Sequence, residues 1–331
     1  MHNEKTQSSS SFPCTYAAKS FSATVRKNSS SGGIFYELAS YVITQCDGVV
    51  YGCAFDDDLR AKHIRCSSIE EAAKCMGSKY SQSDMQVALL QIQTDLRNGL
   101  TVLFTGTPCQ VAAVRQIDAV EKNGTLLTVD IICHGVLSPE VFQEWLAIIE
   151  SVRKKPIYAY EHRSKIMGWS HRERIIYKDG SIEQNTRWSE AWRRYFYDNR
   201  SLRPSCYCCP YTTTARGSDI TIGDFWGIEH TGLKYFKDDL GVSLVLVNSE
   251  PGLNLFSKLN VDKIEASLQD AIPGNPMLLA PSSYKGDRNK VWEEFHRQGL
   301  LNMMKREKFL VSRPRRVASL IKQALSHIFR K

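Results

Sequence analysis

The chain has 331 residues, of which 42% are hydrophobic and 24% are charged, and its formal net charge is +8. This length predicts about two domains with a full hydrophobic core, which excludes a small scaffold that depends on disulfides. The first ten residues are polar, and no run of about 18 apolar residues occurs. We therefore expect neither a secretory signal nor a membrane-spanning helix, and we expect a folded cytoplasmic protein.

Much of the positive charge lies near the C-terminus, where residues 305–331 contain nine Lys or Arg and one acidic residue. No nucleic-acid motif accompanies this charge, so we expect no nucleic-acid partner. The segment from Pro314 onward has apolar residues at helical spacing, which predicts an amphipathic basic helix. Two interpretations stay open. The helix docks on its own domain or a partner, or it makes a peripheral contact with the inner face of an anionic membrane.

The first half of the chain alternates between patterns typical of strands and of helices. Helices are predicted from Ile34, over 85–97, after Pro108 and after Ser138, and buried strands over 48–55, 101–105 and 125–132. This alternation predicts an α/β fold whose core is a mixed, largely parallel sheet. Cys109 and Cys133 follow the last two of these strands. Because ligands bind at the carboxyl ends of parallel strands, we expect both cysteines on one edge of the sheet.

The second half predicts a smaller α+β module. An alternating pattern over 155–180 indicates a hairpin around Asp179-Gly180. A helix containing Trp188, Trp192 and Phe196 follows, and strands are predicted over 218–227 and 241–249. The C-terminal amphipathic helix completes the predicted fold.

Ten cysteines are many for a chain in which we expect no disulfides, so metal or cluster binding is the leading explanation for any closely spaced set. Cys206 and Cys209 have Cys-x-x-Cys spacing, and a proline follows them, as in cluster motifs. A tetrahedral centre needs two more ligands, for which Cys109 and Cys133 are the best candidates. From spacing alone, an iron–sulfur cluster and a structural zinc site are equally favoured, and a chain without metal stays open.

The other early cysteines lack paired spacing, and Cys53 lies inside an apolar strand. We predict them to be small buried hydrophobic residues without a chemical role. They are Cys14, Cys46, Cys53, Cys66 and Cys75.

Several stretches together resemble one family. They are SSSGGIF (29–35), GSKYSQS (77–83), LFTGTPCQ (103–110), DIICHGVLSP (130–139) and the segment from RPSCYCCPY to SDITIGDFWGI (203–228). They are similar to the beta subunits of coenzyme F420-dependent hydrogenases and dehydrogenases. The resemblance implies a redox subunit that carries a flavin, either FAD or FMN, and a 4Fe–4S cluster. It implies that the cluster ligands are Cys109, Cys133, Cys206 and Cys209.

The resemblance also implies an organisation and partners. After a disordered segment 1–12 we expect a flavin-side module over 13–98, a cluster-binding module over 99–275 and a helical basic tail over 276–331. Many relatives carry a ferredoxin-like module that this chain lacks, so we expect a separate ferredoxin-like electron donor. The acceptor is a deazaflavin or nicotinamide carrier or a small-molecule substrate. Shortened relatives of this kind resemble proteins of bacterial cell-surface polysaccharide biosynthesis, and an oligomer stays open.

The sequence offers candidates for flavin binding, although no Gly-x-Gly-x-x-Gly motif occurs. Ser30, Ser31, Gly32 and Gly33 precede a predicted helix, whose N-terminus favours a phosphate; the alternative is an ordinary helix cap with a turn. Ser78, Lys79 and Tyr80 offer a cation and a ring beside the flavin, and the alternative is a surface loop.

His134 beside Cys133 is the candidate catalytic residue. It would hydrogen-bond a reduced flavin or donate a proton, or else tune the cluster potential. Thr107 and Gln110 offer similar hydrogen bonds, and Asp224 orients a ligand or caps a turn. Two other functions stay open: a non-redox zinc or apo scaffold in a glycan-biosynthesis complex, and a transferase, for which no sugar-nucleotide motif occurs.

Overall fold

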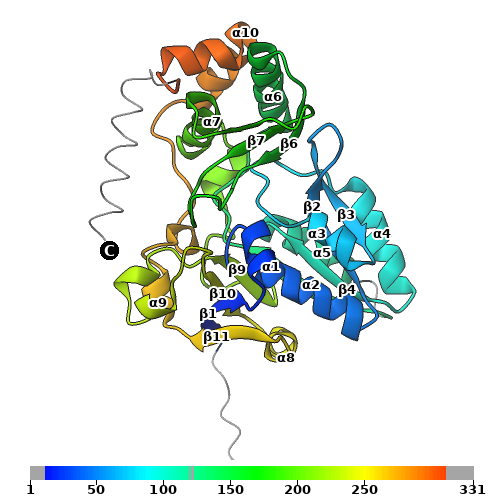
Figure 1. Ribbon diagram of the computed structural model, residues 1–331. Helices are drawn as coiled ribbons and strands as arrows, with labels where there is room; N and C mark the ends of the chain where they lie inside the picture. The colour runs from blue at the N-terminus through cyan, green and yellow to red at the C-terminus, as the bar shows by residue number, and fades with distance from the viewer. Residues whose placement is uncertain (1–11, 119, 121–122, 311–331) are drawn as a thin grey trace, which may run out of the picture.

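The computed structural model describes residues 12–118, 120 and 123–310. Its main feature is an eight-stranded sheet (Figure 1). In spatial order the strands are β11 (Val261–Glu265), β1 (Cys14–Ser20), β10 (Ser243–Val247), β9 (Ile220–Asp224), β5 (Thr125–Ile131), β4 (Thr101–Gly106), β2 (Val49–Phe55) and β3 (Ala61–Cys66). The first and the last strand in the described part of the chain are therefore neighbours in one sheet.

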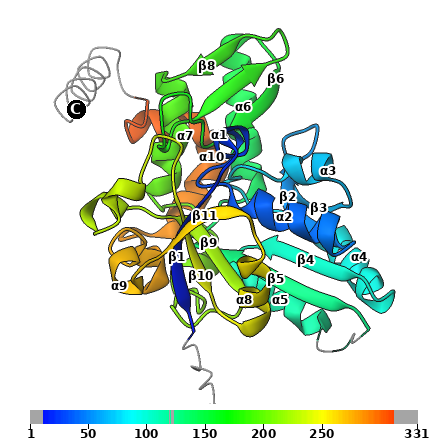
Figure 2. The ribbon, with the colours of Figure 1, turned by 60° about the horizontal axis from the view of Figure 1, so that its bottom comes forward.

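Parallel strands form the centre of this sheet. β2, β4, β5 and β9 run parallel, and antiparallel strands flank them on both sides. β1 lies between β10 and β11 (Figure 2). The register pairs Gly106 at the end of β4 with Asp130 in β5, so the carboxyl ends of these two strands lie side by side. The expectation of an α/β fold with a mixed, largely parallel core is confirmed.

Helices cover both faces of the sheet, which explains why β2 and β4 are largely apolar on both sides. One face packs against α2 (Ile34–Gln45), α3 (Ile69–Lys74) and α8 (Glu250–Ser257). The other face packs against α4 (Gln86–Arg97) and α5 (Pro108–Asp118). Beside these two helices, this face is covered by α9 (Leu268–Ala271), η2 (Ile228–His230), η3 (Lys234–Phe236) and η4 (Pro276–Leu278).

A smaller unit lies at the top of Figure 1. Its antiparallel sheet consists of β6 (Ile157–Glu161), β7 (Arg174–Tyr177) and β8 (Ile182–Gln184). It packs with α6 (Pro139–Arg153), α7 (Arg187–Tyr197) and α10 (Arg288–Arg306) around a core that contains Trp145 and Trp192. The hairpin predicted around Gly180 joins β7 to β8, and Gly180 has a φ of 79° that suits this turn. The smaller α+β module is therefore present.

Two short helices complete the described elements. They are α1 (Ala23–Asn28), before the serine and glycine loop, and η1 (Pro204–Cys208), which contains the first cysteine of the Cys-x-x-Cys pair. The boundary predicted between residues 98 and 99 falls between α4 and β4, and strands on both sides of it belong to the large sheet.

Some expectations concern the chain ends. The disordered segment and the basic amphipathic helix were predicted at residues 1–12 and from Pro314, which lie almost wholly outside the described residues. Within the described part of the chain, no helix has the length and apolar character needed to cross a membrane.

Candidate functional site

The predicted cluster ligands come from three loops at the carboxyl edge of the parallel strands. Cys109 lies in the first turn of α5, directly after β4, and Cys133 follows β5. Cys206 lies in η1, and Cys209 directly follows that short helix. The loop after β5 contacts the segment of η1, since a Cβ atom at Gly135 would lie 3.3 Å from the Cβ atom of Cys206. A backbone hydrogen bond of 2.9 Å from Arg203 to Val136 joins the same two segments.

The four thiols influence one another electrostatically. Burial raises the pKa of Cys133 to about 12, and charges on Cys206, Cys109 and Cys209 raise it too. Burial also raises the pKa of Cys206, with Cys109 and Cys209 contributing in the same direction. Cys109, Cys206 and Cys209 therefore lie within electrostatic range of Cys133, and a positive centre bound among them would favour the thiolate forms.

Backbone N–H groups point at two of these sulfur atoms. A hydrogen bond from Gly135 lowers the pKa of Cys133, and one from Val136 lowers the pKa of Cys206. Gly135 has a φ of 124°, which a residue with a Cβ atom rarely adopts. Across the described residues, no group of three or more His, Cys, Asp or Glu side chains is arranged to hold a single metal ion.

Thr107 and Gln110 lie beside Cys109 but face different partners. The Thr107 hydroxyl is 3.2 Å from the sulfur of Cys109. The Gln110 side chain instead accepts a hydrogen bond from the Thr107 N–H at 2.9 Å and donates to the hydroxyl of Ser83 at 2.8 Å. The Thr107 hydroxyl thus contacts the Cys109 thiol, whereas the Gln110 side chain stabilises the loop between β4 and α5 through hydrogen bonds to Thr107 and Ser83.

The chain of hydrogen bonds continues from Ser83 to a buried histidine. Ser83 Oγ lies 3.0 Å from Nδ1 of His63, and Nε2 of His63 lies 3.0 Å from the Thr105 carbonyl. A neutral imidazole with its proton on Nε2 satisfies both contacts. Burial lowers the pKa of His63 to about 4, which favours that neutral form.

The predicted phosphate loop lies at the N-terminus of α2. Gly33 is the residue before the helix and has a φ of 92°. A Cβ atom on Gly32 would lie 2.3 Å from the Ala18 carbonyl oxygen, so only glycine fits between β1 and β10 at this position. The Gly32 N–H donates to the Ser243 hydroxyl at 3.0 Å, and the Ser31 hydroxyl donates to the Val242 carbonyl at 2.7 Å. The loop is thus fixed to the sheet.

The structure brings the two predicted flavin segments together at one point. The hydroxyls of Ser30 and Ser78 are 2.8 Å apart. Lys79 instead turns back, and its ammonium group donates to the carbonyls of Met76 at 2.8 Å and Gly77 at 3.2 Å. Tyr80 stacks on Phe196 of α7 with ring centres 4.5 Å apart. Of the second segment, only Ser78 contacts the glycine loop through a hydrogen bond.

Two basic residues in the loop after β6 hold the glycine loop, and the sequence did not predict this role. Arg163 donates to both carboxylate oxygens of Asp224 at 2.8 and 2.9 Å, and to the Ser30 carbonyl at 3.1 Å. The Lys165 ammonium donates to the carbonyls of Arg26, Ser31 and Leu240 at 2.5 to 2.7 Å. Asp224 also accepts from the Trp169 indole at 2.6 Å. The signal available in the sequence was the basic run before Gly168-Trp169.

Aromatic rings connect this loop to His134. Trp169 and Trp226 stack with ring centres 4.5 Å apart, and His171 stacks on Trp226 at 4.7 Å. His171 Nδ1 is 2.9 Å from the Tyr197 hydroxyl, and the Tyr197 ring lies edge-on to His134 at 5.0 Å. The cysteine neighbourhood and the Asp224 region are thus linked by packed rings.

His134 is half-buried and has a close side-chain partner in Asn199. Its Nε2 lies 2.6 Å from the amide oxygen of Asn199, and its carbonyl accepts a hydrogen bond from Ser282 at 2.6 Å. Burial lowers the pKa of His134. At neutral pH the ring is therefore uncharged and donates from Nε2 to Asn199, which leaves Nδ1 as an acceptor.

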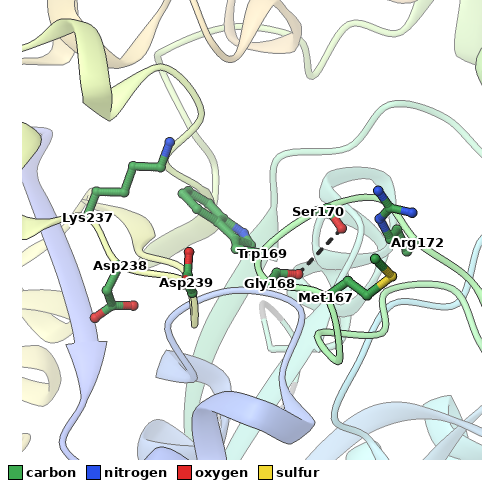
Figure 3. A pocket seen from close by; sticks show the side chains of 8 residues that line it. All are labelled: Met167, Gly168, Trp169, Ser170, Arg172, Lys237, Asp238 and Asp239. Atoms are coloured by element: carbon green, nitrogen blue, oxygen red, sulfur yellow. Dashed lines mark hydrogen bonds between the residues drawn. The ribbon is translucent and has the colours of Figure 1, made fainter. Parts of the chain in front are cut away.

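A cavity of about 260 Å³ opens beside Trp169. Figure 3 shows the indole between Lys237 and Asp238 on one side and Met167 and Arg172 on the other. None of the side chains predicted to bind a cofactor lines it. Two residues that line the cavity connect it to Asp224: the Trp169 indole donates to the Asp224 carboxylate, and the Ser170 carbonyl accepts a hydrogen bond at 2.9 Å from Arg163, the partner of Asp224.

Comparison with known proteins agrees with this architecture. A chain in a solved structure of the F420-reducing [NiFe] hydrogenase complex from Methanosarcina barkeri has a similar fold, with a TM-score of 0.55 and 17% sequence identity. The match covers 86% of this chain and 89% of that chain. At this identity the likeness establishes the fold. No curated protein matches the sequence.

The family follows from the sequence comparison. The family model that describes the C-terminal part of the beta subunit of coenzyme F420 hydrogenase/dehydrogenase matches residues 99–271, which is more than half of the chain. The chain belongs to this family, as the resemblance predicted. Its membership places it among proteins related to redox enzymes.

Proposed function

We propose that this protein is an iron–sulfur flavoprotein oxidoreductase. The observation that supports the proposal is the position of three of the cysteines: Cys109 and Cys133 follow the adjacent parallel strands β4 and β5, and the η1 segment with Cys206 packs against the loop after Cys133. Four thiolates are the usual donor set of a 4Fe–4S cluster. Gly135 and Val136 supply N–H groups to two of the sulfur atoms, and such hydrogen bonds tune cluster potentials.

The proposed flavin site uses the loop before α2. The N-terminus of that helix favours a phosphate of FAD or FMN, and Ser30 and Ser78 present adjacent hydroxyls there. Arg163 and Lys165 support this site indirectly, because they hold the carbonyls of Ser30 and Ser31 and leave the loop in one conformation. Asp224 orients Arg163.

The chemistry of the reaction belongs to the cofactors: when bound, a cluster exchanges single electrons, and a flavin couples them to two-electron transfer. The protein's own residues bind, orient and exclude water. His134, neutral and bonded to Asn199, is placed to accept a hydrogen bond through Nδ1 near the cysteines. Thr107 is placed to modulate the sulfur of Cys109.

The proposed partners follow from this assignment. Electrons come from a separate ferredoxin-like protein, and the flavin reduces or oxidises a deazaflavin or nicotinamide carrier or a small-molecule substrate. We place the protein in the cytoplasm, in cell-surface polysaccharide biosynthesis, with its basic C-terminal segment in contact with the inner membrane face or with a partner. The solved chain with a similar fold comes from a hydrogenase complex, which supports the proposal that this protein has a partner protein.

The test is anaerobic purification followed by an absorbance spectrum and by analysis of iron, sulfide, zinc and flavin. We expect about four irons per chain and a bound flavin. The Cys206→Ala variant should lose most of its iron. Cys208→Ala is the matched control, because Cys208 lies two residues away, is exposed and is not among the proposed ligands, so it should keep its iron.

Two results would overturn the proposal. One is a colourless protein with a single zinc per chain, which would establish a structural zinc scaffold. The other is equal iron loss in the Cys206→Ala and Cys208→Ala variants, which would remove the assigned ligand set.

A further inference from the structure

Two cysteines outside the proposed cofactor site are in direct contact. Cys66 is the last residue of β3, and Cys75 is the residue that follows α3. Their sulfur atoms are 3.7 Å apart. Cys66 is fully buried and Cys75 is 8% exposed, so both thiols lie beneath the surface. The sequence suggested no pair here, because the contact depends on how α3 packs against the neighbouring strands β2 and β3.

The backbone around this pair is built to accommodate it. A Cβ atom on Gly52 of β2 would lie 2.9 Å from Cβ and 3.0 Å from Sγ of Cys75, so the strand has a glycine where the cysteine packs. The surrounding side chains are apolar and include Leu38, Val50 and Ala54. The pair is therefore held in one position.

A cation lies close to the pair. The Lys79 ammonium group interacts electrostatically with Cys53, Cys75 and Cys66 while it donates to the carbonyls at the end of α3. A neighbouring lysine favours thiolate over thiol, which is the form that reacts with oxidants. The two sulfur atoms are within hydrogen-bonding distance, and the hydrogen bond with Cys75 lowers the pKa of Cys66.

We propose that Cys66 and Cys75 form a redox-active dithiol that closes reversibly to an intramolecular disulfide when the protein meets a peroxide. Disulfide sulfurs are about 2.05 Å apart, so each sulfur needs to move by less than one ångström toward the other from the observed 3.7 Å. The bond would join the end of β3 to the end of α3 and close the segment 66–75 into a ring.

The chemistry balances with hydrogen peroxide as the oxidant. The Cys66 thiolate attacks one peroxide oxygen, the O–O bond breaks, and a sulfenic acid forms while hydroxide leaves and takes up a proton as water. The Cys75 thiol then attacks the sulfenic sulfur, so an S–S bond forms, the S–O bond breaks and a second water leaves. Two thiols are oxidised and one peroxide is reduced to two waters. A dithiol reductant reverses the reaction by thiol–disulfide exchange.

The Cys66–Cys75 disulfide would form at the start of the loop of residues 76–80. Cys75 directly precedes residues 76–80, which carry Lys79 and its contacts to the Met76 and Gly77 carbonyls. Ser78 in this loop contacts Ser30. Closing the disulfide therefore fixes one end of the loop without involving any of the four cysteines proposed as cluster ligands.

The positions of the tryptic cleavage sites allow the disulfide to be detected directly by mass spectrometry. Trypsin cuts after Arg65, Lys74 and Lys79, so Cys66 and Cys75 fall on separate short peptides, 66–74 and 75–79. Cys46 and Cys53 share a third peptide, 28–60. The anaerobically purified full chain is treated with increasing hydrogen peroxide, its free thiols are alkylated, and it is digested and analysed by mass spectrometry without reduction.

We expect peptides 66–74 and 75–79 to be recovered joined, in an amount that rises with peroxide and disappears after dithiothreitol. Cys53→Ser is the matched control, because it removes the third nearby thiol but leaves the pair, and the joined product should persist. Cys66→Ser should abolish it. The wild-type digest decides the question even if that variant does not fold.

Three results would overturn the proposal. Both peptides stay separately alkylated at a peroxide dose that already oxidises the exposed Cys208. Peptide 75–79 is joined to 28–60 instead. Cys66 proceeds to sulfinic or sulfonic acid without any joined product.

Discussion

The guanidinium group of Arg163 forms two hydrogen bonds with the carboxylate of Asp224, 2.8 Å from Nη1 to Oδ2 and 2.9 Å from Nη2 to Oδ1. The pair is almost fully withdrawn from water, with side chains 3% and 14% exposed. It connects the loop after β6 to the end of β9, and Arg163 reaches on to the Ser30 carbonyl. One ion pair thus joins the smaller unit, the large sheet and the glycine loop.

Replacing Asp224 by asparagine should destabilise the protein strongly. The substitution leaves the buried guanidinium without its counter-charge, and breaking a buried pair in this way costs about 3–5 kcal/mol. The measurement is urea denaturation of both proteins. Asp179→Asn is the control, since Asp179 pairs with Lys155 at 2.7 Å on the surface and its loss should change stability little. Equal effects of the two substitutions would contradict the role assigned to the buried pair.

Replacing Gly32 by alanine should displace the glycine loop. The new methyl group would lie 2.3 Å from the Ala18 carbonyl oxygen and 2.8 Å from the Ser243 nitrogen, so the backbone of the loop must move. We expect a stability loss of roughly 1–3 kcal/mol, typical of overpacking, and a clear loss of bound flavin. Gly217→Ala is the control, because no atom lies within 4 Å of a Cβ atom there. Flavin content unchanged in the Gly32→Ala protein would separate the loop from the flavin site.

Because His63 is buried in its neutral form, the free energy of unfolding should decrease in mild acid. Burial lowers its pKa from 6.5 to about 4, so between these values the unfolded chain binds a proton that the folded protein does not. The contribution of neutral His63 to the free energy of unfolding is complete above pH 6.5. It decreases as the pH falls towards 4, by up to about 3 kcal/mol.

The measurement for His63 is the free energy of unfolding from pH 4 to pH 7.5 for the wild type and for His63→Gln. Two other histidines act in the same direction, since desolvation lowers the pKa of the half-buried His171 to about 4 and that of the buried His162 to about 3. The difference between the two proteins isolates His63. A difference that does not change with pH would refute the assignment.

Replacing Asn199 by aspartate should raise the pKa of His134. The substitution places a carboxylate where the amide oxygen now lies 2.6 Å from Nε2, and an adjacent negative charge stabilises the imidazolium. The pKa of His134 should change from below 6.5 in the wild type to above it in the variant. The measurement is an NMR titration of the His134 ring signal, assigned with a His134→Gln protein. A pKa that stays below 6.5 would show that Asn199 does not contact the ring in solution.

Local patterns in the sequence predicted much of the central sheet. β4 and β5 are short apolar runs ended by Gly-Thr-Pro and by Cys-His-Gly, and they pair in parallel as expected. The start of α2 after Gly33 and the hairpin at Gly180 follow from turn chemistry. By contrast, β1 contains Lys19 and β11 contains Asp262 and Glu265, so neither has the uniform apolar character of a central strand.

For the candidate site, the sequence predicted which residues take part better than it predicted which residues they contact. The four cysteines were identified by spacing, position and resemblance, and their role as ligands stays a prediction. The role of Arg163 depends on its contacts with Asp224 and Ser30, and the role of Lys165 depends on carbonyls from three distant segments. Because these partners lie far away in the sequence, no local sequence pattern predicts either role. Lys79 was predicted to offer a cation near a flavin or its phosphates, which stays a prediction, and its ammonium group has its hydrogen bonds at the end of α3. Cys66 and Cys75 meet only through tertiary packing.

The position of β1 has a consequence for how the chain folds. Cys14 pairs with Val247 and Ser20 pairs with Val261, so the first strand cannot pair with either neighbour until the chain has been synthesised past residue 243. Pairing over such a long separation is slow, because the intervening loop must close first. During translation β1 therefore remains an unpaired strand. A fragment limited to residues 99–271 would contain β10 and β11 but lack the strand that joins them.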